Sequence, residues 1–511
     1  MEFHSILFAL PEDGPPSGDV AEPHFFGDLN LDQFVVDVTR GFEEYDLAPF
    51  FRAELGRCSA ITYRHEVMQD LDKHEVLAAV QAFALSMRKM RACLDEAKRL
   101  YYGRQKQWWF LEAASRYCQG VQALLVALQA ARCQSGGMSA FISWLSAYVE
   151  SDPFTTLKEE FDEVKAALAG VRYCIHLHGS AVTVLNYEDE EDYGSYILRT
   201  FDRFKQADVK DHSVKLKDWP EMNHVEAQIL DYAAELDPRP FALLDAFCTG
   251  HSGFIDAKIA AFDREIQFYV AYRSYTQPCR AAGLSFSYPV ILETSKAVRC
   301  ENTFDLVLAH KLCAESVAVV TNSFYLEGPE RVFVVSGPNN GGKTTFARTF
   351  GQLHFLGRLG CMVPGQEARL FLYDQLFAHF EREENTHDLR GKLQDDLIRM
   401  HDILQAATSK SIILMNEIFS STTLADALFL CRRIIGEIMN RDALCVCVTF
   451  IEELARLGTQ TVSMVSEMNP DNPSMRTFRV RRRPADGRAY AVSVAEQYGL
   501  TYERIKERVI S

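Results

Sequence analysis

The sequence predicts a protein of more than one domain, in which long helices that carry a small β element precede an α/β domain. Three observations support this fold class: the length, a helical pattern up to about residue 286, and apolar strands that alternate with helices beyond it. At 511 residues, the chain is too long for one ordinary hydrophobic core. Hydrophobic residues make up 48% of the chain, which is enough to fill more than one core.

Apolar residues recur at helical spacing through most of the first half of the chain. One stripe steps by four and three residues and predicts a long helix: Val76, Val80, Phe83, Met87, Met90 and Leu94. Further helical runs are predicted over about 106–132 and 138–150, and another begins after the Ser151-Asp-Pro sequence. We interpret these stripes as the faces with which helices pack against one another.

The period changes from helical to alternating at Val171. Apolar and polar residues alternate as far as His178, and a Gly-Ser pair then leads into a second apolar run, which predicts a β-hairpin. His176 and His178 would share one face of the first strand, but no third metal ligand is evident nearby, so we expect no metal there.

These patterns divide the chain into three predicted parts. Residues 1–30 form an N-terminal segment and linker, residues 31–286 a helical domain with an insert at about 171–220, and residues 287–511 an α/β domain.

The charge and the cysteine content limit the partners and the compartment. The net charge is −16, from 70 acidic and 54 basic residues, so any contact with nucleic acid has to be local or made by a dimer. No apolar run is long enough to span a membrane, and we expect no membrane partner. Thirteen scattered cysteines, an odd number, fit a reducing compartment, so we expect a cytoplasmic protein.

A glycine-rich turn follows an apolar strand at 332–335. Residues 337–344, GPNNGGKT, fit the pattern G-x-x-x-x-G-K-[ST] and precede a predicted helix. Backbone N–H groups in such a turn surround phosphate oxygens, Lys343 would reach the β and γ phosphates, and the Thr344 hydroxyl would bind Mg²⁺. The sequence therefore predicts a site for ATP and Mg²⁺. The predicted ATP-binding residues of this turn are Gly337, Pro338, Asn339, Asn340, Gly341, Gly342, Lys343, Thr344 and Thr345.

Two further strand ends complete the predicted site. An apolar strand at 412–415 ends in Asn416 and Glu417, where Asn416 would help to hold the metal and Glu417 would accept a proton from the attacking water. Glu417 and Lys343 are thus the predicted catalytic residues. A third strand delivers Thr449 to the same edge, where its hydroxyl could sense the γ-phosphate.

Five stretches resemble the ATPase domain of the MutS family of DNA mismatch repair proteins, in the same order and spacing. They read GPNNGGKTT, VPGQEARLFLYDQLF, MNEIFSSTTLADAL, VCVTFIEELARL and DGRAYAVSVAEQYGL. The resemblance covers roughly 290–511 strongly and the helical region by architecture only. It implies a P-loop (ABC-type) ATPase domain that follows a long-helix lever or core domain with a small clamp-like β insert. It also implies a homodimer in which ATP gates the binding of DNA.

The sequence also departs from the family pattern. Asn416 stands where the family has aspartate and Phe450 where it has histidine, so we expect slow hydrolysis. The stretch 386–400 resembles the segment that completes the partner's ATP site in the family dimer, but it lacks the expected serine. We also expect that the mismatch-reading domain, the connector and an Smr domain are absent, so that the bound DNA is branched or otherwise non-B-form rather than mismatched.

The alternative is a nucleotide-gated binding or scaffold protein with little or no hydrolysis and a protein partner. The net charge, the acidic stretch 187–193 and Asn416 favour this alternative. Lys343, Thr344 and Glu417 favour an ATPase. We interpret the arginine-rich stretch 479–484 as an exposed strand beside an acidic surface rather than as a DNA contact.

Overall fold

The computed structural model describes residues 3–14, 21–179, 181–190, 193–202, 222–380, 391–469, 476–484 and 505–506. The DGRAYAVSVAEQYGL stretch, residues 203–220 of the predicted insert and residues 386–390 lie outside the described residues. In the part of the chain that the structure describes, every helix long enough to cross a bilayer is too polar to do so.

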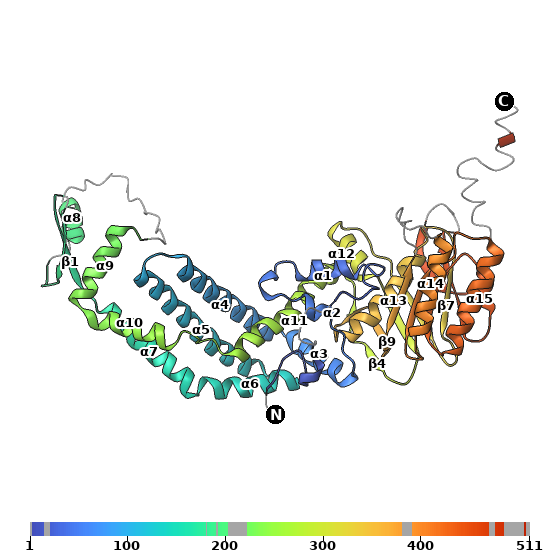
Figure 1. Cartoon of the computed structure of the whole chain (residues 1–511), viewed down its shortest axis with the longest axis horizontal. Coiled ribbons are helices and arrows are strands. Elements are labelled where there is room, and N and C mark those ends of the chain that lie inside the picture. Colours follow the sequence, from blue (N-terminus) through green and yellow to red (C-terminus); the bar gives the residue numbers. More distant parts are fainter. Residues whose placement is uncertain are drawn as a thin grey trace. The chain divides into compact units, whose positions relative to one another are not determined.

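The chain forms two compact units (Figure 1). The first comprises Met1–Phe3, Asp72–Cys133 and Ser139–Asp263, and the second comprises His4–Leu71, Gln134–Met138 and Arg264–Ser511. Residues of the predicted helical domain contribute to both units, and the predicted domain boundaries stay a prediction.

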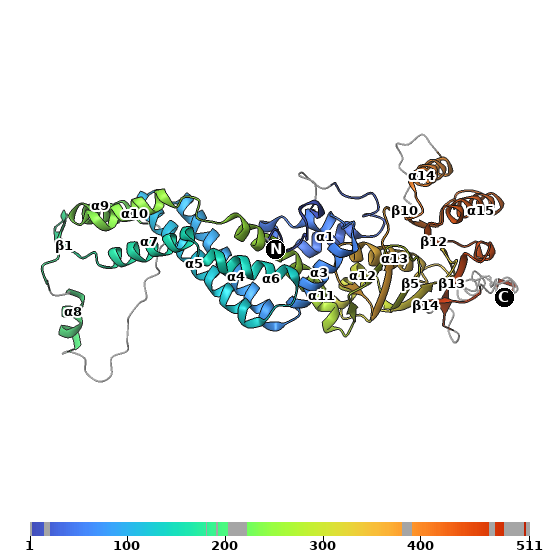
Figure 2. The same ribbon diagram turned by 90° about the horizontal axis from the view of Figure 1, so that it is seen from below.

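The first unit consists mainly of helices. Its helices are α4 (His74–Arg99), α5 (Gly103–Ala131), α6 (Gly136–Val149, which begins in the second unit), α7 (Asp152–Ala169), α8 (Tyr193–Asp202), α9 (His224–Leu236) and α10 (Pro238–Gly250). The stripe on α4 is buried from Val76 to Met90, because α4 and α5 pack side by side along their length (Figures 1 and 2). The predicted packing role of this stripe is confirmed.

A β-hairpin lies between α7 and α8. Strands β1 (Tyr173–His178) and β2 (Ala181–Asn186) pair antiparallel, with His176 opposite Thr183. Most residues of both strands are exposed, so the alternating pattern does not bury one face of this hairpin. Among the described residues, no group of three His, Cys, Asp or Glu side chains could hold a metal ion.

The second unit combines helices with strands. Its helices are α1 (Leu31–Thr39), α2 (Ala48–Arg52), α3 (Cys58–Leu71), α11 (Ala257–Ala281, which begins in the first unit), α12 (Leu306–Ala314), α13 (Lys343–Arg358), α14 (Lys392–Ala406) and α15 (Leu424–Asn440), with short 3₁₀ turns η1 (Pro11–Asp13), η2 (Glu43–Tyr45) and η3 (Glu452–Arg456). The helical and α/β content that the sequence predicts is therefore present, and the sheets are of mixed type.

A six-stranded sheet organises the second unit. Its strands run in the order β10 (Leu376–Phe380), β11 (Ile412–Asn416), β12 (Leu444–Val448), β7 (Val332–Ser336), β13 (Thr461–Met468) and β14 (Arg476–Arg482). The first five strands are mutually parallel, and only β14 runs antiparallel to its neighbour.

Two smaller sheets accompany it. One has the order β4 (Val290–Leu292), β9 (Glu367–Phe371), β5 (Val298–Thr303) and β6 (Asn322–Leu326), and the other pairs β3 (Phe286–Ser287) with β8 (Val363–Pro364).

Helices cover both faces of the six-stranded sheet (Figure 2). Ile413 and Met415 of β11 join α14 and α15 in one hydrophobic core. Leu414, between them in sequence, points to the other face and packs against Gly351 of α13. Strands covered on both faces have to be apolar throughout, which is why β7, β11 and β12 are continuous hydrophobic runs.

Candidate nucleotide-binding site

Strand β7 carries the glycine-rich turn at its carboxyl end. All five of its residues are buried, and it pairs in parallel with β12 on one side and β13 on the other. Ligands of open parallel sheets bind beyond the carboxyl ends of the strands. The turn that follows Ser336 lies at that edge.

The turn adopts a conformation that depends on its glycines. The φ angles of Gly337 and Gly342 are 129° and 90°, in the region that side chains rarely adopt. A Cβ atom on Gly337 would lie 2.8 Å from the Cβ atom of Ser466, and one on Gly341 would overlap the Ser466 hydroxyl. Helix α13 begins directly afterwards at Lys343, without a side-chain cap, so its first N–H groups remain available for anion oxygens.

Lys343 is almost fully buried, with 4% of its side chain exposed. Its Nζ atom donates a 2.9 Å hydrogen bond to the Gly337 carbonyl and lies 3.6 Å from Oε1 of Glu417. Burial lowers the pKa of the Lys343 ammonium, and the neighbouring Glu417 carboxylate opposes that shift. The ring of Phe450 lies over the ammonium at 3.9 Å, a distance typical of a cation–π contact.

Thr344 and Asn416 face each other across the sheet edge. The Thr344 hydroxyl donates a 2.9 Å hydrogen bond to Oδ1 of Asn416, the last residue of β11. Mg²⁺ prefers oxygen ligands. A pair of side-chain oxygens beside a phosphate-binding turn fits that ion, although neither of the two carries a charge.

Glu417 follows β11 with its backbone in the left-handed region, at a φ of 53°. Its N–H still donates to the Val448 carbonyl at 2.9 Å, which extends the pairing of β11 with β12 by one residue. This φ is unusual for a residue other than glycine, and such conformations concentrate at functional sites. Here it allows the Glu417 carboxylate to lie close to Lys343.

The remaining predicted residues lie around this centre. Thr449 directly follows β12, donates its N–H to the Val335 carbonyl at 3.0 Å and accepts a hydrogen bond from the Ile451 N–H at its hydroxyl. Pro338 is buried within the turn, whereas Asn339 and Asn340 are exposed on its rim.

Thr345 lies in the first turn of α13, where its carbonyl accepts a hydrogen bond from Thr349. The structure thus brings Lys343, Thr344, Asn416 and Glu417 together, with Thr449 at the same sheet edge. Their roles in binding and catalysis remain predictions.

Sequence reasoning missed two polar residues that support the site. Ser466 of β13 donates a 2.6 Å hydrogen bond to the Gly341 carbonyl and packs against the turn. Asp396 of α14 accepts a hydrogen bond from the Phe419 N–H and lies 3.0 Å from His379 Nε2, which fixes the segment after Glu417. No local motif marks Ser466, whereas Asp396 belongs to the stretch 386–400 that resembles a family segment.

Comparison with known proteins agrees with this geometry. The family model of MutS domain V matches residues 333–508. Endonuclease MutS2 of Thermus thermophilus is 28% identical over 192 residues, which are 37% of this chain and 25% of that protein. DNA mismatch repair protein MutS of Thermotoga maritima is 27% identical over 198 residues, 38% of this chain and 24% of that protein.

A third relative matches over a longer stretch. DNA mismatch repair protein MutS of Halalkalibacterium halodurans is 26% identical over 259 residues, 47% of this chain and 30% of that protein. The chain thus matches less than a third of the length of each of these three relatives. The domain V match begins in β7 and includes the glycine-rich turn, Asn416, Glu417 and Ser466, so this part of the chain is a domain of the MutS domain V family.

Proposed function

We propose that this protein is a Mg²⁺-dependent ATPase of the MutS type, which binds and hydrolyses ATP in a homodimer to gate the binding of DNA. The observation that carries the proposal is the convergence of two pairs at one sheet edge. Lys343 lies 3.6 Å from Glu417, and Thr344 lies 2.9 Å from Asn416. A cation, a carboxylate and two oxygen donors beside a phosphate-binding turn are what ATP hydrolysis requires of a protein.

Each residue of this centre has a proposed role. The backbone N–H groups of the turn 337–342 and the start of α13 would bind phosphate oxygens. Lys343 would meet the β and γ phosphates, and Glu417 would accept the proton of the attacking water. Thr344 and Asn416 would hold Mg²⁺, which when bound supplies positive charge to the phosphate oxygens.

The comparisons support DNA as the partner. Two of the relatives are named DNA mismatch repair proteins, and the third is named an endonuclease. The finer proposal, that the DNA is branched or otherwise non-B-form, rests on the sequence alone. A cytoplasmic location rests on the same ground. A dimer is supported by the family resemblance, in which the partner subunit completes each ATP site.

The test is the steady-state rate of ATP hydrolysis with and without a panel of DNAs: duplex, mismatched, forked and four-way junction. We expect slow basal turnover that changes most with forked or junction DNA and disappears in Lys343→Ala. Light scattering of Glu417→Gln with ATP should then show a dimer. The proposal would be contradicted if wild type hydrolyses ATP no faster than Lys343→Ala. It would also be contradicted if Glu417→Gln remains a monomer in the presence of ATP.

A second function is favoured by one specific observation, the position of Phe450. Its ring lies 3.9 Å from the Lys343 ammonium and is half exposed, where a family member has histidine. Together with the uncharged Asn416 and a net charge of −16, this favours a nucleotide-gated binding protein with little hydrolysis and a protein partner. DNA binding measured against salt distinguishes the two functions, because a backbone contact weakens steeply as salt rises.

A further inference from the structure

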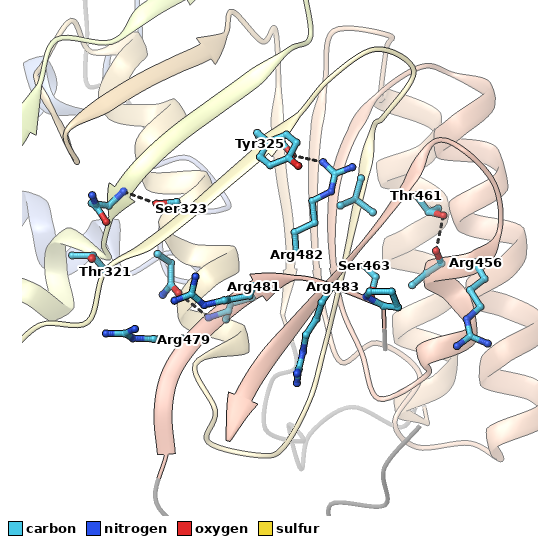
Figure 3. Close-up of a pocket in the computed structure, with 16 residues that line it drawn as sticks. Thr321, Ser323, Tyr325, Arg456, Thr461, Ser463, Arg479, Arg481, Arg482 and Arg483 are labelled. Carbon is cyan, nitrogen blue, oxygen red and sulfur yellow. Dashed lines mark hydrogen bonds between the residues drawn. The ribbon is translucent and has the colours of Figure 1, made fainter. Parts of the chain in front are cut away.

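A polar hollow lies in the same unit, beside strands β13 and β14 of the six-stranded sheet. It encloses about 810 Å³ and is bordered by β6, β14, the first half of β13 and η3 (Figure 3). Five arginines line it: Arg456, Arg479, Arg481, Arg482 and Arg483. Thr321 and Ser323 also line it, at the end away from Arg456 (Figure 3).

The alternation of β14 places three of these arginines in a row. Val480 is buried, and Arg482 is held against Tyr325 and Glu330, with its guanidinium 4.3 Å from the tyrosine ring. Arg479, Arg481 and Arg483 occupy the alternate positions, and the Arg483 N–H continues the pairing with the Ser463 carbonyl at 3.2 Å. Alternate residues of a strand are ~7 Å apart, so the row spans ~14 Å.

Charge compensation within this row is incomplete. Arg481 is paired with Glu467 at 3.2 Å. Arg479 and Arg483 are exposed, and neither has an acidic partner among the described residues. Two guanidinium groups left unpaired on a chain with a net charge of −16 indicate a surface for an anion that comes from outside the chain.

The spacing decides which kind of anion fits. One phosphate cannot reach both ends of a row of ~14 Å. A polyanion with charges at regular intervals can, and guanidinium groups bind phosphates through paired hydrogen bonds. Arginine, serine, threonine and asparagine side chains are also the usual contacts of a nucleic-acid backbone.

We propose that this hollow binds the phosphodiester backbone of a nucleic acid, with Arg479 and Arg483 on separate phosphates. The proposal deepens the function proposed above and rests on it, because it names the surface of this chain that meets DNA. It also replaces our interpretation of the stretch 479–484 as an exposed strand without a DNA contact.

Strand β14 also connects this hollow to the glycine-rich turn. Asn322 of β6 bonds to the Phe478 carbonyl at 3.2 Å and to the Val480 N–H at 2.7 Å, so it fixes the backbone on both sides of Arg479. The same Phe478 carbonyl lies 3.3 Å from where a Cβ atom on Gly342 would be. A nucleotide that moves the turn therefore acts on the strand that carries Arg479, and ATP should change the affinity for nucleic acid.

The test compares two double variants of the full chain. Arg479→Gln with Arg483→Gln removes the unpaired charges of the hollow. Arg432→Gln with Arg433→Gln removes two exposed arginines of α15 and is the control for net charge. Dissociation constants of labelled duplex, single-stranded, forked and four-way junction DNA are measured by fluorescence anisotropy over a range of salt concentrations, and ATP binding is measured in parallel.

In the first variant, the plot of log affinity against log salt should become less steep, by about 1.8 for duplex and about 1.4 for single strands. These changes correspond to the loss of two phosphate contacts. The control should keep the wild-type slope, and both variants should bind ATP as the wild type does. An unchanged slope, or an equal loss in the control, overturns the site and leaves DNA binding in place. If polyglutamate displaces DNA from wild type but not from Arg479→Gln with Arg483→Gln, the hollow binds an acidic protein instead. A wild type that binds no DNA overturns the DNA partner itself.

Discussion

The ammonium of Lys343 and the carboxylate of Glu417 lie 3.6 Å apart, although one begins α13 and the other follows β11. Only 4% and 22% of the two side chains are exposed, so each charge depends on the other for compensation. A phosphate that enters the turn would take the place of Glu417 beside Lys343. Nucleotide binding would thereby release the carboxylate that we propose accepts the proton of water.

Replacing Lys343 by alanine should weaken ATP binding strongly. The change removes the cation that we propose binds the phosphates, and it leaves Glu417 without its partner. A hydrogen bond to a charged group contributes ~1.5–3 kcal/mol, so affinity should fall by roughly 10- to 150-fold. Equilibrium titration with a fluorescent ATP analogue measures it, and Lys410→Ala, an exposed lysine before β11, is the control. Equal affinities of Lys343→Ala and wild type would refute the assignment.

Alanine at Gly341 should disturb the turn by steric overlap. Its Cβ atom would overlap the Ser466 hydroxyl and lie 2.9 Å from the Pro338 carbonyl. We expect a loss of ATP affinity of about tenfold or more, equal to ~1.4 kcal/mol. Adding Ser466→Ala should restore part of it, because the overlapping hydroxyl is removed. Gly436→Ala in α15, where a Cβ atom meets nothing within 4 Å, should bind ATP normally.

A full recovery of ATP binding is not expected from the double variant, because the Pro338 carbonyl remains in place. Wild-type affinity in the single variant Gly341→Ala would show that the turn opens when nucleotide binds. The contact between Ser466 and Gly341 would then play no part in binding.

The parts of the site that the sequence predicts are those that local pattern determines. Continuous apolar runs predict buried parallel strands, and β7, β11 and β12 are such strands. The glycine spacing predicts the turn before α13. Helix ends also fall close to expectation, since the run predicted at 106–132 is α5, Gly103–Ala131.

The contacts that the sequence could not supply come from strand order. Ser466 lies beside Gly341 only because β13 pairs with β7, and Phe450 lies over Lys343 only because β12 is the other neighbour of β7. Neither pairing leaves a local pattern. The same holds for the arginine row, since alternation along β14 indicates one shared face but not the hollow that β6 and η3 complete.

Stability should depend on the ionisation of Glu54. Burial raises the pKa of this carboxyl from 4.5 to about 7, against the opposing charge of Arg358 at 3.5 Å, and Tyr373 donates a hydrogen bond to it. The folded state therefore binds a proton more tightly than the unfolded state. The free energy of unfolding should fall by about 3 kcal/mol as pH rises from about 4.5 to about 7, and then level off.

Denaturant unfolding at about pH 5 and about pH 8 measures this contribution when wild type is compared with Glu54→Gln. The variant should lose less stability between the two pH values than wild type does. His65 and His354 are also buried, and burial lowers the pKa of each to about 4. Because wild type and variant both retain these histidines, their contribution to the pH dependence cancels in the comparison. Glu315→Gln, an exposed glutamate after α12, should retain the wild-type pH dependence. Identical profiles for Glu54→Gln and wild type would rule Glu54 out.

Aspartate at position 416 should increase both the dependence on Mg²⁺ and the rate of ATP hydrolysis. The Asn416 amide oxygen accepts a 2.9 Å hydrogen bond from Thr344, so it already lies where a metal-bound water or the metal itself would be held. Charged acceptors form hydrogen bonds about twice as strong as neutral ones, which adds ~1–2 kcal/mol to the placement of the metal. Glu417 is unchanged by this substitution and remains available to accept the proton of water.

Steady-state hydrolysis across a Mg²⁺ titration measures the effect for wild type, Asn416→Asp and Glu417→Gln. We expect half-maximal activity of Asn416→Asp at about tenfold lower Mg²⁺, the equivalent of ~1.4 kcal/mol, with a higher maximal rate. Glu417→Gln should be nearly inactive at every Mg²⁺ concentration while it still binds ATP, because an amide cannot take up the proton of water whereas Lys343 and the turn are unchanged. If Asn416→Asp has the Mg²⁺ dependence and rate of wild type, Asn416 does not contact the metal, and Thr344 alone would supply a side-chain ligand.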